Sequence, residues 1–275
     1  SWTISISGDT YFANTVLLLS ANSSIQTTSF VADSSNNNSQ LTVVGDTRAQ
    51  NFNPYQAGYY SNYFDGSGDY LTITSNLTSI SFGTGDFTVE CWIYFTSVAT
   101  DCGILGSSGN GGYDFVWRTS TGLNIGRINL AFDNTFAWTP TVGQWYHVAY
   151  SRSGTSLKVF VNGTQVGTTA TNSISYDAAS SAVIGASTSN PDRPMTGYIS
   201  NLRLTKGTAL YTTAFTPSTT PLLPVANTQL LTCQSNRLVD NSPNNFTFTK
   251  NGDTTVSPAH PFTTVYQAGT RYYST

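Results

Sequence analysis

The sequence predicts an all-β protein built as a sandwich of two antiparallel sheets. Short runs of alternating apolar and polar residues recur along the 275 residues, and Gly, Asn, Asp or Pro bounds each run. No window shows the sustained 3.6-residue apolar periodicity of a helix. Aromatic residues reach 13% of the chain, whereas charged residues make up 9%, against about 25% in an ordinary domain. This composition favours strands over exposed helical faces.

The strands are expected, in chain order, wherever the alternation is clear. They cover residues 70–73, 87–95, 123–132, 145–150, 157–161 and 199–204. In the run 87–95 both faces are largely apolar, which is typical of a strand inside a sandwich, and Trp92 and Trp145 are expected to be core residues. The pair Asn162-Gly163 predicts a type I′ hairpin turn, because both residues tolerate positive φ angles.

The two ends of the sequence carry copies of one segment. Residues 13–61 recur as residues 226–274, with small insertions and in unbroken order. Each copy has the pattern of two strands joined by a turn rich in Asp and Asn. The repeat divides the chain into an N-terminal edge segment (1–61), a body (62–225) and a C-terminal edge segment (226–275).

The duplicated segments are expected to mediate assembly, since the charged residues that normally guard sheet edges are scarce in them. We expect the C-terminal copy to pair where the N-terminal copy pairs, either within the same sandwich or on a neighbouring subunit. In the second case the chain would assemble with other copies of itself by strand exchange. The residues expected to carry this role are Leu17, Leu18, Asp33, Asn37, Leu230, Leu231, Asp240 and Asn244.

A series of motifs runs through the body in a fixed order. The motifs occupy residues 64–71, 85–93, 144–149, 157–163, 183–185, 197–203 and 211–217. In this order they resemble the laminin-G-like, concanavalin A-like jelly-roll family, including its pentraxin-like branch, over roughly residues 60–220. The resemblance implies a concanavalin A-like jelly-roll sandwich of two antiparallel sheets, a fold that is used to bind glycans or proteins and that hosts many functions.

The flanking copies are similar to segments of tandem modules in tailed-phage structural proteins. This resemblance implies a non-catalytic virion structural protein, a phage fibre or a surface appendage of the capsid or tail. Such a protein would contact copies of itself or other virion proteins and attach to host-surface glycans. The alternative is a secreted bacterial carbohydrate-binding module of an adhesin or matrix protein, and a glycoside hydrolase is a distant third. The expected location is therefore a virion surface or the extracellular space.

The composition argues against several partners. A net charge of −3 with 11 Lys and Arg leaves no basic face for nucleic acid. The longest aliphatic run, 16–19, is far shorter than the ~20 residues of a membrane-spanning helix. The amino terminus shows no basic segment of a secretory leader. Cys91, Cys102 and Cys233 are expected to be buried free thiols, with a Cys91–Cys102 disulfide as the alternative.

No enzymatic activity is expected. Glycoside hydrolysis needs two carboxyl groups across the scissile bond, and Glu90 is the only glutamate. Asp65 and Asp69 form a pair, but they lie in a Gly-rich turn where Asp side chains commonly accept backbone hydrogen bonds. His147 falls in a strand motif that, by the family resemblance, holds a packing residue. Neither His147 nor His260 belongs to a pattern of base and nucleophile.

No metal or other cofactor is expected. The family resemblance makes calcium the one ion to consider, since laminin-G-like and pentraxin-like domains often hold it at a loop rim. The segments 33–37 and 240–244 resemble the first positions of a calcium loop, but neither is followed by the acidic residue that completes one. The favoured interpretation of both segments is an Asx-stabilised turn.

Glycan binding needs aromatic faces beside polar groups at one rim of the sandwich. The Gly-rich segment 106–117 is the best predicted loop of this kind, followed by 136–138 and 190–193. The candidate glycan-binding residues in these loops are Tyr113, Asp114, Trp117, Trp138, Asp192 and Arg193.

Overall fold

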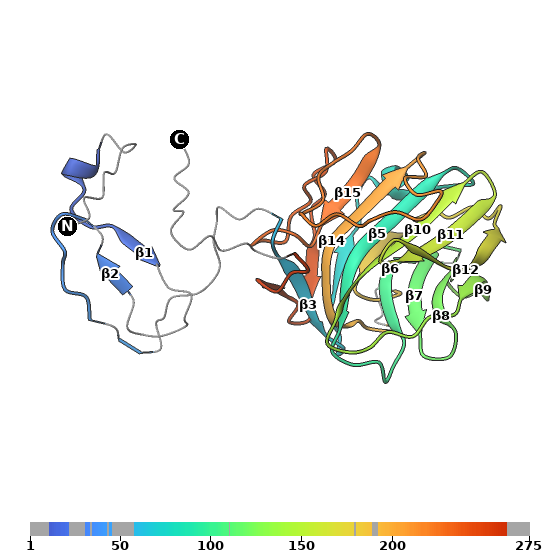
Figure 1. Ribbon diagram of the computed structural model, residues 1–275, viewed down its shortest axis with the longest axis horizontal. Coiled ribbons are helices and arrows are strands. Elements are labelled where there is room, and N and C mark those ends of the chain that lie inside the picture. The colour runs from blue at the N-terminus through green and yellow to red at the C-terminus, as the bar shows by residue number, and fades with distance from the viewer. Residues whose placement is uncertain are drawn as a thin grey trace. The chain divides into compact units, whose positions relative to one another are not determined.

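The computed structural model describes residues 11–21, 31–33, 35–42, 44–45, 58–109, 111–178, 180–188 and 192–262. The chain divides into two compact units. The smaller unit consists of Ser1–Asn53 with Thr264–Thr275, and the larger unit is Pro54–Thr263. Figure 1 shows the larger unit as two layers of strands.

The larger unit is a sandwich of two antiparallel sheets. The eight-stranded sheet follows the order β12-β11-β10-β5-β14-β3-β17, and β15 also pairs with β14. Its strands are β3 (Ser61–Asp65), β5 (Phe87–Phe95), β10 (Trp145–Ser153), β11 (Ser156–Val161), β12 (Thr164–Thr171), β14 (Thr196–Lys206), β15 (Thr228–Thr232) and β17 (Thr255–Ser257).

The seven-stranded sheet follows the order β16-β4-β13-β6-β7-β8-β9. Its strands are β4 (Tyr70–Ile73), β6 (Cys102–Ser108), β7 (Tyr113–Arg118), β8 (Gly122–Arg127), β9 (Phe132–Phe136), β13 (Ser181–Ile184) and β16 (Thr249–Asn251). The prediction of an all-β sandwich with two antiparallel sheets is therefore confirmed.

The hydrophobic core lies between the two sheets. Alternate residues of β5 point into it and are at most 2% exposed, as the sequence pattern predicted for Phe87, Val89, Cys91, Ile93 and Phe95. The opposite side of the core comes from the seven-stranded sheet, which contributes residues such as Phe115 and Ile125. The three cysteines are buried and free, so the expectation of buried thiols is confirmed and the Cys91–Cys102 disulfide is absent.

Two details of the strand prediction are wrong. The expected single strand 123–132 is two strands, β8 and β9, because the chain turns between them at Asn129, which adopts a positive φ of 64°. The expected loop 106–117 is mostly strand, since β6 and β7 are joined by only a short turn. The aromatic and β-branched residues in the second half of this stretch favour a strand, and this preference outweighs the tendency of its glycines to form a loop.

The predicted hairpin turn at Asn162-Gly163 is confirmed. It joins β11 to β12, and its two residues have φ angles of 49° and 78°. Helical structure among the described residues is limited to 3-10 turns, namely η1 (Phe12–Asn14) in the smaller unit and η3 (Leu77–Ile80) in the larger. None of the helices in the described ranges has the length and apolar character needed to cross a bilayer.

The described part of the C-terminal copy pairs with the sandwich of its own chain. β15 pairs with β14, β16 with β4, and β17 with β3, so this copy adds strands to both sheets. In the smaller unit, the N-terminal copy forms β1 (Leu19–Ala21) and β2 (Val31–Asp33), which pair with each other. The two copies therefore do not pair at equivalent places: the C-terminal copy pairs with the sandwich, whereas the described strands of the N-terminal copy pair with each other. Strand exchange with a neighbouring subunit stays a prediction.

Candidate functional site

A row of four aromatic side chains crosses the outer face of the eight-stranded sheet. Tyr63, Tyr198, Tyr94 and Trp145 lie at matched register positions of the neighbouring strands β3, β14, β5 and β10. Their ring centroids are 4.9 Å apart for Tyr63–Tyr198, 5.6 Å for Tyr198–Tyr94 and 5.4 Å for Tyr94–Trp145. All four side chains are partly exposed. We call these four residues the aromatic row.

A hollow of about 310 Å³ adjoins the row at Trp145. Trp92 and Phe262 supply aromatic walls, with their ring centroids 6.0 Å apart. The Oδ1 atom of Asn162 accepts the backbone N–H of His147 at 2.9 Å, which leaves the amide nitrogen of this exposed residue as a donor. The hollow is lined by Trp92, Trp145, Asn162, Pro217, Ser218, Thr219, Pro261 and Phe262.

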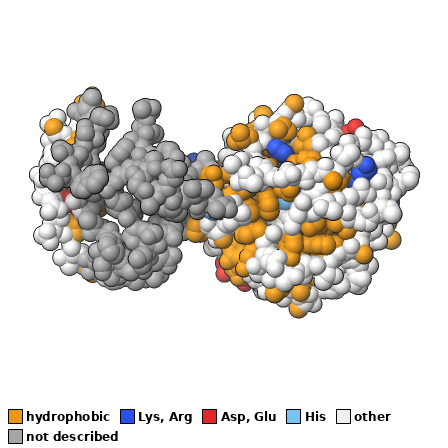
Figure 2. All heavy atoms as spheres, in the orientation of Figure 1, with side chains coloured by type: hydrophobic (Ala, Val, Ile, Leu, Met, Phe, Trp, Pro, Cys, Tyr) orange, Lys and Arg blue, Asp and Glu red, His pale blue; other side chains and the backbone are white. Residues whose placement is uncertain are grey.

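The aromatic row was missed by the sequence prediction, which placed Trp92 and Trp145 in the core. Both are only partly buried, and neither belongs to the core cluster between the sheets. Alternation along β5 already put Trp92 and Tyr94 on the face opposite to the core residues. The register that aligns them with β3, β10 and β14 depends on tertiary pairing, which the sequence pattern does not specify. Figure 2 shows hydrophobic side chains gathered on one face of the larger unit.

A buried charged network lies beside the hollow, under the segment 207–224. Arg203 donates to Oε1 of Glu90 from Nε at 2.9 Å and from Nη2 at 2.6 Å. The other carboxylate oxygen accepts the Tyr211 hydroxyl at 2.8 Å and lies 3.0 Å from Nε2 of His147. Burial raises the pKa of Glu90, but the His147 hydrogen bond and the Arg203 charge outweigh it and hold the pKa below its usual value.

The network determines what Glu90 can do. Glu90 is 1% exposed, and its oxygens already face donors from three side chains. A carboxylate in this state is neither accessible to a substrate nor poised to take up a proton near neutral pH. Glu90 therefore ties β5, β10 and β14 to the segment that covers them, and it has no catalytic geometry.

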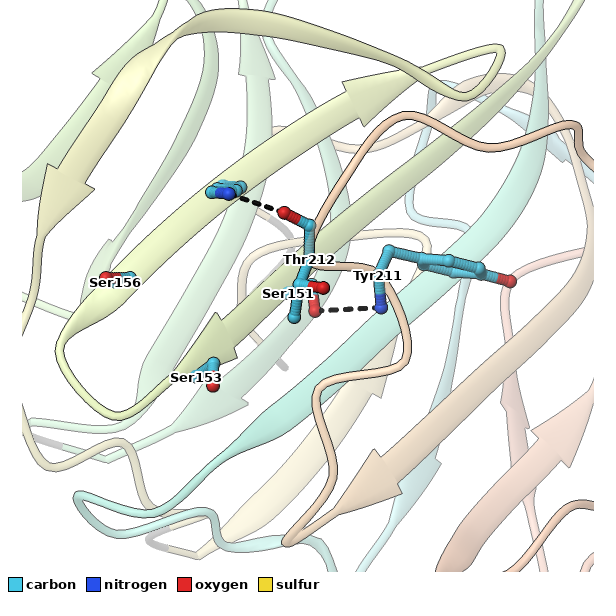
Figure 3. Close-up of a pocket in the computed structure, with 6 residues that line it drawn as sticks. Ser151, Ser153, Ser156, Tyr211 and Thr212 are labelled. Atoms are coloured by element: carbon cyan, nitrogen blue, oxygen red, sulfur yellow. Dashed lines mark hydrogen bonds between the residues drawn. The ribbon is translucent and has the colours of Figure 1, made fainter.

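A second hollow, of about 200 Å³, lies on the same sheet and is shown in Figure 3. It is lined by Ser151, Ser153, Ser156, Lys158, Tyr211 and Thr212. The backbone N–H of Tyr211 donates to Oγ of Ser151 at 3.4 Å, and the Lys158 ammonium donates to the carbonyl of Thr212. The ring of Tyr211 points away from the serines (Figure 3). These lining residues offer hydroxyls for hydrogen bonding, but they include neither a carboxylate nor a histidine that could act as a base.

Three carboxylates approach one another where the body meets the C-terminal copy. Oxygens of Asp65, Asp69 and Asp253 lie within 4.8 Å of one another. Asp69 is fully buried, and it accepts the backbone N–H groups of Asp65 at 3.0 Å and Asp253 at 2.7 Å. Burial raises the pKa of Asp69, and the two backbone hydrogen bonds oppose that rise. The expected use of Asp65 and Asp69 as turn caps is confirmed, since Asp65 Oδ1 accepts the Ser67 N–H at 2.6 Å.

The aromatic residues predicted for glycan binding lie elsewhere than expected. Tyr113 and Trp117 are in β7, belong to the core, and are 0% and 2% exposed. The indole N–H of Trp117 donates to the carbonyl of Trp138 at 3.2 Å, and Trp138 packs partly buried against the same core. A ligand cannot stack on Tyr113 or Trp117 in this structure, because both ring faces are covered by protein.

The polar residues predicted for glycan binding do come together. Arg193 lies 2.6 Å from Asp192 and 3.5 Å from Asp114, and its guanidinium lies over the ring of Phe132 at 5.7 Å. Asp114 is 3% exposed, and its Oδ1 atom has no partner among the described residues. Burial raises the pKa of Asp114 to about 6, although the charge of Arg193 opposes the rise. The first half of the predicted segment 190–193 lies outside the described residues.

The residues predicted for assembly form matching turns in the two copies. Asp33 and Asp240 each accept hydrogen bonds from the backbone two residues further on, as the Asx-turn interpretation predicted. Leu230 and Leu231 are fully buried in the larger unit, whereas Leu17 and Leu18 in the smaller unit are 49% and 40% exposed. Asn37 donates from Nδ2 to the carbonyl of Val16, and Asn244 donates from Nδ2 to the carbonyl of Gln229 in β15.

Comparisons with known proteins agree with this architecture. The model of the concanavalin A-like lectin/glucanases superfamily matches residues 65–212, which is more than half of the chain. No curated protein matches the sequence. A solved structure described as that of a carbohydrate-binding protein candidate from Bacteroides ovatus is similar with a TM-score of 0.56 and 15% identity, and the match covers 73% of this chain and 60% of that one.

A heptameric SAP-like pentraxin from Limulus polyphemus is similar with a TM-score of 0.51 and 16% identity, over 75% of this chain and 97% of that one. At these identities the structures show a shared fold. The chain thus spans less than two thirds of the Bacteroides protein and nearly all of the pentraxin. Together with the family match over the body, the two-sheet architecture shows that the chain belongs to the concanavalin A-like lectin/glucanase superfamily.

Proposed function

We propose that the chain is a non-catalytic glycan-binding module and that the aromatic row is its binding surface. The observation that carries the proposal is the contact of four partly exposed rings on four neighbouring strands, next to a hollow with aromatic walls. Neighbouring strands are about 4.8 Å apart, so the row extends over about 14 Å from β3 to β10. A surface of this length suits a short linear oligosaccharide.

The chemistry of the row fits sugar rings. Tyr and Trp combine a large apolar face with a polar edge, and a sugar ring likewise presents apolar C–H faces and hydroxyl edges. At the end of the row, the exposed amide of Asn162 and the hydroxyls of Ser218 and Thr219 provide partners for sugar hydroxyls. Few polar groups beside apolar walls are the usual composition of a small-ligand site.

The carboxylates support a binding function without hydrolysis. The hollow beside the row is lined by neither Asp nor Glu, whereas glycoside hydrolysis needs two carboxyl groups flanking the bond that is cut. The nearby Glu90 is enclosed by its donors.

Substitutions in the row test the proposal. In a glycan-array screen followed by calorimetry with the best-bound oligosaccharide, we expect Trp145→Ala and Tyr94→Ala to weaken binding at least about 10-fold, since stacked rings supply most of the contact. Tyr11→Ala is the matched control, because Tyr11 is 75% exposed and belongs to the smaller unit. Unchanged affinity in both row variants, or an equal loss in the control, would exclude the row as the site.

We further propose that this module acts on a virion surface, as part of a phage fibre or appendage. The resemblance of the flanking copies to phage structural modules supports this setting, and so does a charged fraction of 9%, which suits neutral contacts between protein surfaces. Gold-labelled antibody against the chain should decorate purified particles in electron microscopy. Labelling of free secreted protein alone would favour the alternative, a bacterial adhesin or matrix module.

A further inference from the structure

The N-terminal copy is organised around one carboxylate. Oδ1 of Asp33 accepts the backbone N–H groups of Leu18 and Ser35, and Oδ2 accepts the Ser35 hydroxyl and the backbone N–H of Ser39, each at 2.9 Å. Asp33 is 5% exposed. These four hydrogen bonds hold the pKa of Asp33 far below its usual value, with the Leu18 N–H as the largest cause.

The C-terminal copy has the same arrangement with equivalent atoms. Oδ1 of Asp240 accepts the backbone N–H groups of Leu231 at 3.0 Å and Ser242 at 2.9 Å. Oδ2 accepts the Ser242 hydroxyl at 2.7 Å and the backbone N–H of Phe246 at 3.0 Å. Each donor stands at the repeat position of its counterpart around Asp33.

The agreement extends beyond the carboxylates. Nδ2 of Asn37 donates to the carbonyl of Val16 at 2.9 Å, and Nδ2 of Asn244 donates to the carbonyl of Gln229 at 2.8 Å. The residues that follow, Asn38 and Asn245, have positive φ angles of 47° and 48°. The two copies are therefore the same local structure built twice, and each holds a strand segment against an Asx turn.

The copies differ in what covers their leucines. In the C-terminal copy Leu230 and Leu231 are 0% exposed, because β15 lies along β14 and the Leu230 side chain enters the core of the sandwich. We call residues 228–246 the closing segment, since they cover this part of β14. In the N-terminal copy Leu17 and Leu18 are 49% and 40% exposed.

The described part of the chain thus holds two segments with the structure of the closing segment. It holds one sandwich edge, on β14, with which such a segment pairs. The edge along Leu202–Thr205 of β14 is already paired with β15. Exposed leucines are costly to leave in water, and an edge strand with little charge readily pairs with another chain. Between residues 11 and 45 the only charged residue is Asp33, and it is buried within its own turn.

We propose that the described part of the N-terminal copy, residues 15–21, 31–33 and 35–39, is a second closing segment, which docks on the β14-type edge of another sandwich of the same fold that lacks a closing segment of its own. The match in hydrogen bonds determines the orientation of the segment, and the leucine pair supplies its apolar contact. The partner has to carry a vacant edge, because each copy of this chain has two closing segments and one edge, so that identical chains always leave one closing segment per chain without an edge.

A double-mutant cycle in the full chain tests whether the N-terminal copy fits such an edge. Asp240→Ala removes the carboxylate that organises the native closing segment and so vacates the β14 edge. Asp33→Ala removes the equivalent group from the N-terminal copy. The readout is the midpoint of thermal unfolding by tryptophan fluorescence, which reports mainly on the sandwich because four of the five tryptophans lie in residues 54–263.

We expect Asp33→Ala alone to leave the midpoint unchanged, because the β14 edge of the wild type is already paired with β15. In the Asp240→Ala background the N-terminal copy should take over the vacant edge, so that adding Asp33→Ala lowers the midpoint by about 5 °C or more. Light scattering then shows which chain supplies the N-terminal copy that occupies the β14 edge. A monomer indicates the same chain and a dimer indicates a second chain, and both results support the proposal that this copy fits the edge.

The proposal is overturned if Asp33→Ala has no further effect in the Asp240→Ala background. Should the Asp240→Ala chain fail to fold, Asp240→Asn replaces it, because the amide oxygen keeps part of the hydrogen bonding and vacates the edge only partially. Glycan binding by the aromatic row is a separate readout, so failure of this cycle leaves the proposed function intact.

Discussion

Single residues show where burial and charge oppose each other. Asp114 has a pKa raised from the usual 3.8 to about 6, because its carboxylate is buried. For an acid whose pKa is higher in the folded state, the folded state keeps its proton after the unfolded chain has lost it. Stability therefore falls as the pH rises from about 4 to about 6 and stays lower above that.

Asp114→Asn should remove this loss. We expect the variant to be more stable than the wild type at pH 7, by up to about 3 kcal/mol, with the loss of the Arg193 attraction reducing the gain. The difference should shrink toward zero at pH 4. Urea unfolding at several pH values checks this. A variant less stable than the wild type at pH 7 would contradict it.

The sequence predicted the residue environments unevenly. The turn carboxylates Asp33 and Asp240 were predicted well, because an Asx turn involves neighbours within a few residues. Trp92 was assigned to the correct face of its strand but wrongly to the core, because an apolar residue in a sandwich strand is usually buried. Tyr113 and Trp117 were assigned to a loop because their neighbours are rich in glycine.

At the scale of elements, the tight turns show which glycines the fold depends on. Gly163, in the β11–β12 turn, has a φ of 78°, and its missing Cβ leaves room for the carbonyl oxygen of Phe215, with which a Cβ would clash. Its own carbonyl accepts the backbone N–H of Phe215 at 3.0 Å. This contact holds the segment 207–224 over the Glu90 network.

Gly163→Ala should therefore destabilise the sandwich through both backbone strain and a clash. Gly154→Ala is a matched control, because Gly154 in the β10–β11 turn has a φ of 57° but no atom within 4 Å of its missing Cβ. We expect a loss of about 1 kcal/mol for the control, from the positive φ alone, and of about 3 kcal/mol or more for Gly163→Ala. Equal losses in denaturant unfolding would show that the Phe215 contact contributes nothing.

Strand prediction succeeded where local alternation of apolar residues determines the structure. It failed where the pairing between distant strands determines which residues meet. The run 87–95 matches β5 at both ends, since its alternation is unbroken and it pairs on both sides with β10 and β14. The aromatic row could not be predicted, because its four residues are far apart in the sequence and meet only through the register of three strand pairs.

At the scale of the whole molecule, the scarcity of charged residues can be compared with the structure of the duplicated segment. The duplicated segment has its leucines buried in the C-terminal copy and exposed in the N-terminal copy, and Asp33 is the one charged residue between residues 11 and 45. The family and its two-sheet fold were predictable from motif order, whereas the location of the proposed binding surface was not. The same fold carries ligand sites on different faces and loops, so membership alone does not locate the site.

Metal independence is the prediction that concerns the molecule as a whole. Among the described residues, Asp65, Asp69 and Asp253 bring three carboxylates close enough to bind one ion. Both oxygens of Asp69, however, already accept backbone N–H groups. No member of that cluster lines the hollow beside the aromatic row. Glycan affinity measured by calorimetry should therefore be the same with EDTA and with calcium. If EDTA abolishes binding, calcium restores it and Asp253→Ala reproduces the loss, then the carboxylate cluster is a metal site and the aromatic row does not bind glycans on its own.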